Sequence, residues 1–373
     1  MNILQICYKY PPFFSGYGKQ LETVNKKIIE EDKDKSITVL TCYGNKDSNI
    51  YYQNRIKIKS LFKSKTEGGK VHYYIFSIFI AFRFLLSFWK ADVIHIIKAG
   101  PELIIPTAIA KLFGKKVIIK VAQDDLENLL PERLSFLRRI RLYFLRKTDA
   151  IVVLSKKIAD EARSIKIEEN KLKYIPNCVN FNRFNFEKGN NGKLSKNGKK
   201  YIFVGAISKR KGILDLLLAL EQYNGEKILF SFIGPLYDVD YFNNRLNFIN
   251  SKGYIDIEYY GSVNDPERFL KKHDCLILPS YNEGMPNVAL EAMACGLYLL
   301  LSNISVHSEL CLIAQGKTFE LSNVESILSE ILRFNSLPYT QDNKIAQYEI
   351  AKNTYSDTVV SQLYIQLYNN ICH

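Results

Sequence analysis

The chain has 373 residues, of which 47% are hydrophobic and 24% are charged. These proportions are ordinary for a globular protein, and the length suits one large or two medium domains. The formal net charge of +13 favours an anionic substrate or an anionic membrane surface, although drift in a lysine-rich proteome would produce the same excess. No zinc finger or RNP-like segment accompanies the charge, so we expect no nucleic acid partner.

The cysteines and the first residues indicate a compartment. Seven cysteines are scattered along the chain with no Cys-x-x-Cys spacing, which is typical of small buried residues in a reducing environment. The chain starts directly with a strand pattern and shows no basic region followed by a long apolar core, as a signal peptide would. We therefore expect a cytoplasmic protein.

The first half alternates strand and helix patterns, which predicts a parallel, doubly wound sheet. Strands are expected at 2–7, 36–42, 55–60, 93–97, 116–121 and 151–154. After the first strand, the loop Ser15-Gly16-Tyr17-Gly18 leads into a helix over 19–30, an arrangement that lets phosphate approach a helix N-terminus. A dinucleotide fingerprint needs a third glycine where Leu21 stands, so the loop is weak evidence by itself.

Two helical segments of the first half are unusual. Segment 73–89 is almost wholly apolar but is interrupted by Arg83, and it is shorter than the roughly 20 apolar residues of a membrane span. It predicts a buried or interfacial helix. Segment 131–147 mixes leucine, isoleucine and phenylalanine with six basic residues. Such a helix either lies on anionic lipid or presents a solvated basic face.

The second half begins after a polar segment at 187–200, which reads as a linker. A strand at 201–204 leads into the loop 205–212, which carries Lys209, Arg210 and Lys211 before the next helix. A basic, glycine-bounded loop at a helix N-terminus favours a diphosphate. Further strands are expected at 228–233, 255–260 and 275–278.

The last of these strands precedes two carboxylates. Glu283 lies in a loop, and Glu291 lies about one turn into a helix that begins near Pro286 and ends near Gly296. Both can face the space before the helix N-terminus, where free N–H groups favour phosphate. Carboxylates beside a phosphate suit the hydroxyls of a sugar. The pattern predicts a sugar nucleotide site; the alternative, an amphipathic surface helix with incidental acids, leaves Met285, Pro286 and Gly296 unexplained.

The string EGMPNVALEAMACG resembles the E-x7-E signature of the retaining glycosyltransferases of family four. The resemblance implies the GT-B fold, in which two Rossmann-like domains face a cleft. We expect an acceptor-side domain over 1–185, with the C-terminal helix at 355–373 packing back on it, and a donor-binding domain over 186–354. The implied reaction moves a hexosyl unit from a nucleotide diphosphate sugar to a saccharide or lipid-linked glycan in surface polysaccharide biosynthesis. No cofactor or essential metal is implied.

The resemblance also implies roles for single residues. Glu283, Lys211 and Asp125 are the expected catalytic residues. Glu291 would hold the ribose, and the segment after Glu283 would hold the sugar. The residues implied at the donor are Gly16, Arg210, Lys211, Gly284, Met285, Pro286, Asn287, Val288 and Glu291.

Several positions depart from the family pattern. Ala206 stands where an arginine usually binds the donor phosphates, and either Lys209 or Arg210 is available to replace it. Segment 121–125 lacks the usual histidine, which leaves Asp125 as the nearest polar side chain. Segment 302–309 lacks the usual glycines. His95, on a predicted strand, is expected to pack rather than to catalyse.

Two other functions fit parts of the pattern. A nucleotide-sugar-binding protein without transferase activity would keep Glu291 but would have no use for Glu283. A dehydrogenase is disfavoured by the incomplete glycine fingerprint. If segment 131–147 does contact anionic lipid, the enzyme is peripheral on the inner face of the cell membrane.

Overall fold

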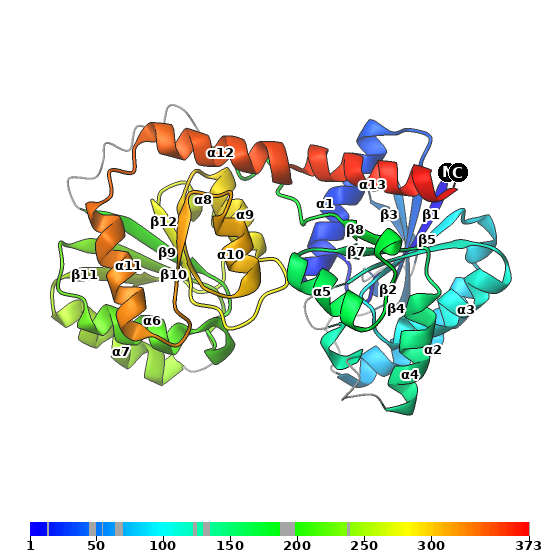
Figure 1. The fold of residues 1–373 in the computed structure, drawn as a ribbon, viewed down its shortest axis with the longest axis horizontal. Helices are drawn as coiled ribbons and strands as arrows, with labels where there is room; N and C mark the ends of the chain where they lie inside the picture. Colours follow the sequence, from blue (N-terminus) through cyan, green and yellow to red (C-terminus); the bar gives the residue numbers. More distant parts are fainter. Residues whose placement is uncertain are drawn as a thin grey trace. The chain divides into compact units, whose positions relative to one another are not determined.

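The chain forms two compact α/β units in a computed structural model that describes residues 1–12, 15–44, 50–53, 55–63, 70–121, 125–129, 135–186, 198–236 and 239–372. One unit comprises Met1–Cys178 and Asp357–His373, and the other comprises Val179–Ser356 (Figure 1). The chain therefore passes from the first unit to the second after Cys178, before the boundary at 185 expected from the sequence. It returns at Asp357.

The first unit is built on an eight-stranded sheet in the order β3-β4-β2-β1-β5-β6-β7-β8. The strands are β1 Asn2–Ile6, β2 Ser36–Gly44, β3 Ile50–Gln53, β4 Ile56–Lys63, β5 Val93–Ile97, β6 Lys116–Lys120, β7 Ala150–Val153 and β8 Leu172–Tyr174. All the expected strands are present. The predicted parallel sheet is confirmed, with one addition at its edge, where the short strand β3 pairs antiparallel with β4. Neither β3 nor β8 was expected from the sequence, since each is too short to show a clear apolar run.

Helices cover both faces of this sheet, which is why its central strands are apolar on both sides. Helices α1 and α13 share a core with one face, and α2 to α5 lie on the other. The bounds are α1 Gly16–Glu31, α2 Lys70–Leu85, α3 Ile104–Leu112, α4 Phe136–Arg146, α5 Lys156–Ser164 and α13 Asp357–Cys372, with short 3-10 turns η1 Phe88–Lys90, η2 Pro101–Leu103, η3 Glu127–Leu129 and η5 Glu169–Lys171. The helix expected at 131–147 is α4, and residues 131–134 lie outside the described residues.

The second unit contains six parallel strands in the order β11-β10-β9-β12-β13-β14. Their bounds are β9 Lys200–Val204, β10 Ile228–Ile233, β11 Ile255–Tyr259, β12 Cys275–Leu278, β13 Tyr298–Ser302 and β14 Gly316–Phe319. Counted within the unit, this is the 3-2-1-4-5-6 order of a Rossmann fold, and the order reverses between β9 and β12.

The helices of the second unit complete its layers (Figure 1). They are η6 Lys209–Lys211, α6 Ile213–Gln222, α7 Val239–Ser251, α8 Pro266–Leu270, α9 Asn287–Ala294, α10 Ser305–Cys311, α11 Val324–Ser336 and α12 Gln341–Tyr355. In the part of the chain that the structure describes, none of the helices combines the length and the apolar character needed to cross a membrane.

His95 shows how the C-terminal helix belongs to the first unit. Its ring is fully buried on β5, and Nδ1 lies 2.8 Å from the hydroxyl oxygen of Tyr368 on α13. The ring of Tyr364 packs against it, with centroids 5.6 Å apart. Burial, with a smaller effect of the Lys120 charge, lowers the pKa of His95 to about 3. The histidine is therefore a neutral packing residue of the core.

This burial predicts a loss of stability in acid. The unfolded chain binds a proton at His95 near pH 6.5, whereas the folded chain does so only near pH 3, so stability is lost as pH falls below 6.5. Between pH 7 and pH 5 the contribution of His95 should fall by about 2 kcal/mol. Urea unfolding followed by the fluorescence of Trp89, in the same unit, measures this change. The variant His95→Gln should show a smaller change over this interval, and equal changes in the two proteins would contradict the prediction.

Candidate functional site

Two loops of the second unit meet where the strand order reverses. Loop 205–212 follows β9 and loop 279–286 follows its neighbour β12. The backbone N–H of Tyr281 donates to the carbonyl oxygen of Arg210 at 3.1 Å, and the Arg210 guanidinium donates to the carbonyl oxygen of Asn282 at 3.1 Å. Ligands of open α/β sheets bind at the carboxyl ends of strands at such a reversal. The loops predicted to carry the site therefore lie together at the expected place.

Gly212 permits the close approach of the two loops. Its φ is +69°, in the left-handed region, and it stands between η6 and α6. A Cβ atom at this position would lie 1.9 Å from the carbonyl oxygen of Pro279. No other residue could hold the basic loop against the 279–286 loop without moving one of them.

Lys211 and Glu283 form an ion pair between the two loops. Their side chains are only 14% and 9% exposed, so each charge is largely shielded from water and held in place by the other. An ammonium group has three N–H donors, and one of them serves Glu283. Two N–H donors of the group remain for another acceptor. The structure thus brings together two of the three residues predicted to be catalytic.

Helix α9 presents a narrow polar face. Pro286 is its N-cap, and Asn287, Val288 and Glu291 are half-buried while the remaining helical residues are buried. These three positions lie on one side of the helix by their spacing. Gly284 and Pro286, in the approach to the helix, are buried. Glu291 therefore shares the accessible side of α9 with the helix N-terminus, as the spacing of the two carboxylates predicted.

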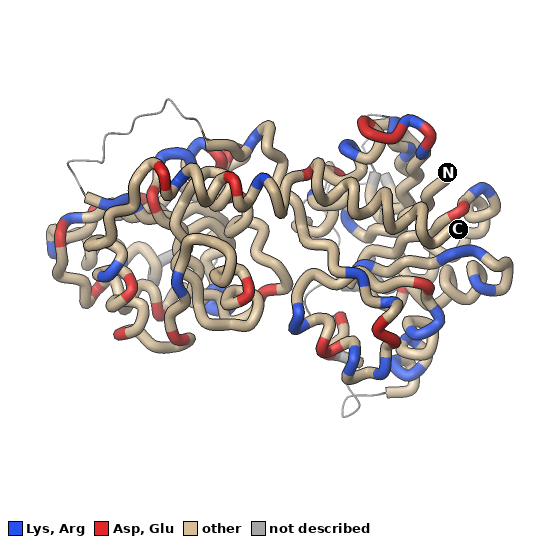
Figure 2. The backbone as a smooth tube through the Cα atoms, turned by 45° about the horizontal axis from the view of Figure 1, so that its top comes forward, with Lys and Arg blue, Asp and Glu red and all other residues tan. Residues whose placement is uncertain are grey.

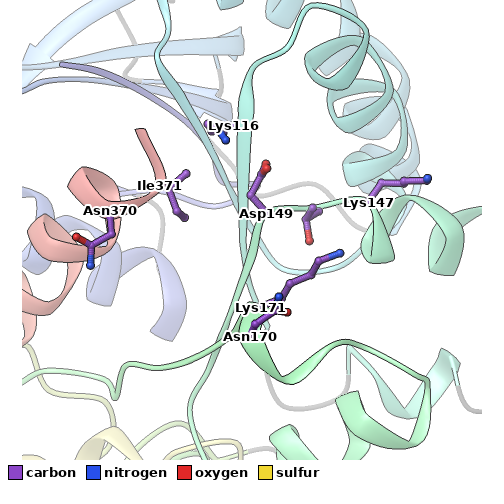
Figure 3. Close-up of a pocket in the computed structure, with 8 residues that line it drawn as sticks. Lys116, Lys147, Asp149, Asn170, Lys171, Asn370 and Ile371 are labelled. Atoms are coloured by element: carbon purple, nitrogen blue, oxygen red, sulfur yellow. The ribbon is translucent and has the colours of Figure 1, made fainter. Parts of the chain in front are cut away.

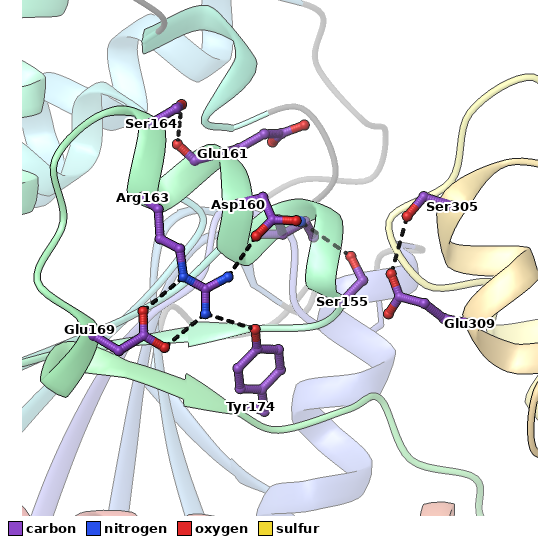
Figure 4. Close-up of polar contacts among 10 residues, drawn as sticks. Ser155, Asp160, Glu161, Arg163, Ser164, Glu169, Tyr174, Ser305 and Glu309 are labelled. Atoms are coloured by element: carbon purple, nitrogen blue, oxygen red, sulfur yellow. Dashed lines mark hydrogen bonds and ion pairs between the residues drawn. The ribbon is translucent and has the colours of Figure 1, made fainter.

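The segment without glycines supports the loop through side chains instead. Ser302 donates from Oγ to the carbonyl oxygen of Ser280 at 2.6 Å. The buried His307 on α10 lies with Nδ1 3.1 Å from the carbonyl oxygen of Ser302. Burial is the main cause that lowers the pKa of His307 to about 4, so the ring is neutral. Further along α10, Ser305 donates to Glu309 at 3.2 Å (Figure 4).

The role of His307 could not be read from the sequence. His307 lies in the short helix α10, Ser305–Cys311, between polar residues, and a lone histidine in such a segment gives no signal of burial. Tyr281 was missed for the same reason; its hydroxyl donates to Asp215 on α6 at 2.6 Å and ties the loop to that helix.

Two family models match the chain. "Glycosyltransferase Family 4" matches residues 34–183, and "Glycosyl transferases group 1" matches residues 185–351. A Klebsiella pneumoniae protein, described as an uncharacterized 41.2 kDa protein in the cps region, is 25% identical over 79% of this chain and 83% of its own length. The capsular polysaccharide biosynthesis glycosyltransferase CapH of Staphylococcus aureus is 28% identical over 42% of this chain and 49% of its own length.

Solved structures share the fold over the whole chain. Sucrose-phosphate synthase from Thermosynechococcus elongatus superposes with a TM-score of 0.80 at 15% identity, over 99% of this chain and 98% of its own. Anabaena HepE, solved with UDP and glucose, has a TM-score of 0.74 at 15% identity, over 99% of this chain and 100% of its own. The chain is a glycosyltransferase of the GT-B fold. Its two sheets are the two Rossmann-like halves that this fold requires.

The first unit of the glycosyltransferase carries the other predicted site residues. Gly16 is the first residue of α1, behind the N-cap Ser15, whose Oγ accepts from the N–H of Gly18 at 3.0 Å. A Cβ atom at Gly18 would lie 2.1 Å from the carbonyl oxygen of Lys9, so this position also requires glycine. The loop is thus closed tightly at the carboxyl end of β1.

Asp125 lies after β6, at the same edge of the first sheet. Its carboxylate accepts from the N–H of Ala99 at 3.1 Å and lies 3.8 Å from the ammonium of Lys98. It therefore joins the ends of β5 and β6. The neighbouring positions Ala122 and Gln123, where the sequence lacks the family histidine, lie outside the described residues.

A cavity of about 390 Å³ in the first unit lies at the opposite edge of the sheet (Figure 3). It is lined by Lys116, Asp149 and Lys171, near the amino ends of β6 and β7. Asp149 pairs with Lys111 and accepts from the N–H of Val117 at 2.7 Å, so it anchors the start of β6. None of the predicted site residues lines this cavity.

An exposed ion-pair network in the same unit centres on Arg163, which contacts Asp160, Glu169 and Tyr174 (Figure 4). Exposed pairs of this kind contribute little to stability. Among the described residues, no three His, Cys, Asp or Glu side chains gather in a way that could hold a metal ion.

The fit at Gly212 generates a prediction. Gly212→Ala should displace loop 205–212 or loop 279–286 and separate Lys211 from Glu283, because the new methyl group overlaps Pro279. The matched control is Gly253→Ala, whose φ of +77° imposes a similar backbone strain but whose Cβ would meet nothing within 4 Å. We expect Gly212→Ala to lower the melting temperature and ligand binding clearly more than the control, measured by thermal unfolding and calorimetry. Equal effects would show that the close approach is unimportant.

Proposed function

We propose that this glycosyltransferase is a retaining enzyme of family four. It moves a hexosyl unit from a nucleotide diphosphate sugar to a saccharide or lipid-linked glycan acceptor in surface polysaccharide biosynthesis. The observation that carries the proposal is the Lys211–Glu283 pair beside the accessible face of α9, where the strand order of the second sheet reverses.

Similar proteins support the substrate classes. HepE was solved with UDP-glucose. A Campylobacter jejuni protein that is 29% identical over 34% of this chain is an N,N'-diacetylbacillosaminyl-diphospho-undecaprenol α-1,3-N-acetylgalactosaminyltransferase. CapH takes part in capsular polysaccharide biosynthesis, and the first relative described above belongs to a cps region. A nucleotide sugar donor and a glycan acceptor on a lipid carrier suit these names.

The proposed donor pose follows the polar groups of the second unit. The diphosphate lies at the N-terminus of α9, where the helix dipole and the Lys211 ammonium favour negative charge. Glu291 accepts from the ribose hydroxyls. Glu283 and the backbone of 284–288, which includes Gly284, Met285 and Asn287, contact the hexose. In the first unit, Gly16 stands at the N-terminus of α1, and its part in donor binding stays a prediction.

In the proposed reaction, the bond from the anomeric carbon to the donor phosphate oxygen breaks as an acceptor hydroxyl attacks from the same face. The departing phosphate oxygen takes the acceptor proton, so the nucleoside diphosphate leaves and no side-chain base is consumed. Lys211 stabilises the charge that grows on the diphosphate, a role that a metal ion fills in other enzymes. Asp125 shapes the acceptor side through its bonds to the ends of β5 and β6.

The structure supports Lys211 as the main phosphate cation of loop 205–212. Arg210 is exposed and its guanidinium donates to Asn282, and Lys209 is also exposed. Arg210 therefore steadies the loop of Glu283 rather than replacing the arginine that is missing at Ala206. A lysine offers a point charge in place of a bidentate fork.

The proposed location is the cytoplasm, with peripheral contact at the inner face of the cell membrane. Helix α4 carries four arginines and exposes Phe136, Leu137 and Tyr143. Basic residues near an anionic surface contribute about 1 kcal/mol each, so contact by α4 alone is reversible and sensitive to salt.

Donor binding tests the proposal. In a thermal-shift panel of UDP-, GDP- and ADP-sugars, one nucleotide sugar at a hundred times its Kd should stabilise the protein by about 2.7 kcal/mol.

Glu291→Ala should weaken the binding of that donor by about 1.5–3 kcal/mol, because a charged hydrogen bond to the ribose is lost. The control is Glu325→Ala, an exposed carboxylate of α11. A folded Glu291→Ala protein with an unchanged donor Kd would contradict the role proposed for Glu291. Donor binding by the parent without product formation would favour a nucleotide-sugar-binding protein that lacks transferase activity.

Metal removal provides a separate prediction. Because Lys211 and the helix N-terminus supply the positive charge, turnover should persist in excess EDTA, and added Mg²⁺ should not raise it. Product formation by the EDTA-treated enzyme, with anomeric configuration read by NMR, checks both this point and retention. Complete loss of turnover that metal restores would contradict it.

A further inference from the structure

Helix α2 carries two apolar stripes, and the core of the first unit uses only one. Phe76, Ile80 and Phe84, followed by Phe88 in η1, are 0% exposed and face the sheet. The second stripe follows the same helical spacing on the outside. The stripe continues past the end of α2 into η1. Its members are between 57% and 67% exposed and comprise Ile78, Phe79, Phe82, Leu86 and Trp89. A helix that packs only against a core needs one apolar stripe. The exposure of the second stripe to solvent therefore indicates contact with another partner.

A cavity of about 310 Å³ lies beside the outer stripe, between β4 and α2. Its walls are Leu61, Phe62, Ile75, Phe79 and Phe82, and among the described residues Arg83 is the charged one that lines it. An apolar cavity with a single cation at its wall suits part of an apolar chain that ends in an anionic group.

The neighbouring helices extend the apolar surface. The ring of Phe113, after α3, meets Trp89 edge to face with centroids 4.9 Å apart, and Leu112 is 80% exposed. Helices α2 and α3 contact each other, as do α3 and α4 (Figure 1). On α4, Phe136 and Leu137 are exposed as well. We call the outer stripe of α2 with Trp89, Leu112, Phe113, Phe136 and Leu137 the apolar face.

The helical segments that carry the apolar face have charged side chains of one sign. Segments 70–90, 104–112 and 136–146 contain bases but not one Asp or Glu. Over most of the chain, by contrast, acids and bases are interspersed (Figure 2). Burial, and after it the positive charges of Lys57, Arg83 and Lys90, lower the pKa of Lys59 on β4. An occupant of this face should therefore be apolar and anionic at once.

We propose that the apolar face inserts into the interfacial layer of an anionic phospholipid bilayer. Its aromatic and aliphatic side chains enter the boundary between headgroups and acyl chains, while Lys57, Lys59, Arg83 and Lys90 contact lipid phosphates. Helix α2 has 16 residues. At 1.5 Å per residue it is shorter than the roughly 30 Å hydrocarbon layer, so it lies in the membrane plane.

The charge pattern disfavours the main alternative occupant. A second copy of this chain, seated by two-fold symmetry, would bring the same cations against each other. The proposal differs from surface contact by α4, because insertion of apolar side chains is less sensitive to salt than charge attraction is. The membrane proposal rests on the proposed function in one respect. A lipid-linked acceptor, which resides in a membrane, gives the enzyme a reason to bind there.

The chain contains a single tryptophan, Trp89, which is 60% exposed on the apolar face and reports on insertion. With phosphatidylglycerol–phosphatidylcholine vesicles, its emission should shift to the blue and be quenched by brominated lipid chains. With phosphatidylcholine alone the shift should be much weaker. Raising salt after binding should leave a substantial part of the shift.

The matched variants are Phe82→Ser with Leu86→Ser on the apolar face, and Leu312→Ser, which is 81% exposed in the second unit. Because all three side chains are exposed, the variants should fold. The double variant should lower the vesicle partition coefficient at least about tenfold, since two large apolar side chains no longer enter the layer. Leu312→Ser should bind like the parent. Changing Arg138 and Arg139 to Glu should weaken binding mainly at low salt.

Three outcomes would overturn the proposal. One is an unchanged Trp89 emission with acidic vesicles. Another is equal vesicle binding by the double variant and the parent. The third is a dimer in solution that the double variant converts to a monomer without any change in vesicle binding, which would make the face an interface between copies. Donor binding is measured separately, so vesicle binding without donor binding would reject the proposed function and leave the membrane face intact.

Discussion

The contact between two loops of the second unit determines what the site can do. Loops 205–212 and 279–286 leave neighbouring strands on either side of the reversal in strand order, and Gly212 lets them touch. The Lys211–Glu283 pair exists only because of this contact. It places a cation that suits a phosphate next to a carboxylate that suits a sugar hydroxyl. A nucleotide sugar has both a phosphate for the cation and hydroxyl donors for the carboxylate.

The same contact is supported by side chains at the positions where the sequence departs from the family pattern. With alanine at 206, no fork-shaped guanidinium is available there. The exposed Arg210 instead donates to the carbonyl oxygen of Asn282 in the Glu283 loop. On the buried side, Ser302 donates to Ser280 of the same loop, and His307 contacts the carbonyl oxygen of Ser302. The loop thus depends on side-chain contacts where the family uses glycine and backbone approach. A consequence is that substitutions at Ser302 or His307 should displace the loop of Glu283 without changing Glu283 itself.

Much of the fold could be predicted because its signals are local. Buried parallel strands such as β5, β10 and β12 are continuous apolar runs, and their predicted bounds match the structure. The edge strand β3 is half exposed and four residues long, so its pattern resembles that of a loop. The loop position of Glu283 and the helical position of Glu291 could be predicted from spacing and helix-end residues. The partner of Glu283 was harder to predict, because Lys211 and Glu283 are 72 positions apart in the chain and meet only through the order of the strands. The exposure of the outer stripe of α2 was hidden for a related reason: an apolar residue looks the same in sequence whether it faces a core or a membrane.

The C-terminal helix adds a constraint on how the molecule is made. Helix α13 completes the core of the first unit, where Tyr364 and Tyr368 cover His95, yet it follows the whole second unit in the chain. During synthesis the first unit therefore emerges with one side of its sheet only partly covered, and it stays so until the second unit has been translated. The nascent first unit exposes buried aromatic surface for that interval. The connectivity of the chain thus sets an order of folding: the core of the unit that is synthesised first is the last to be completed.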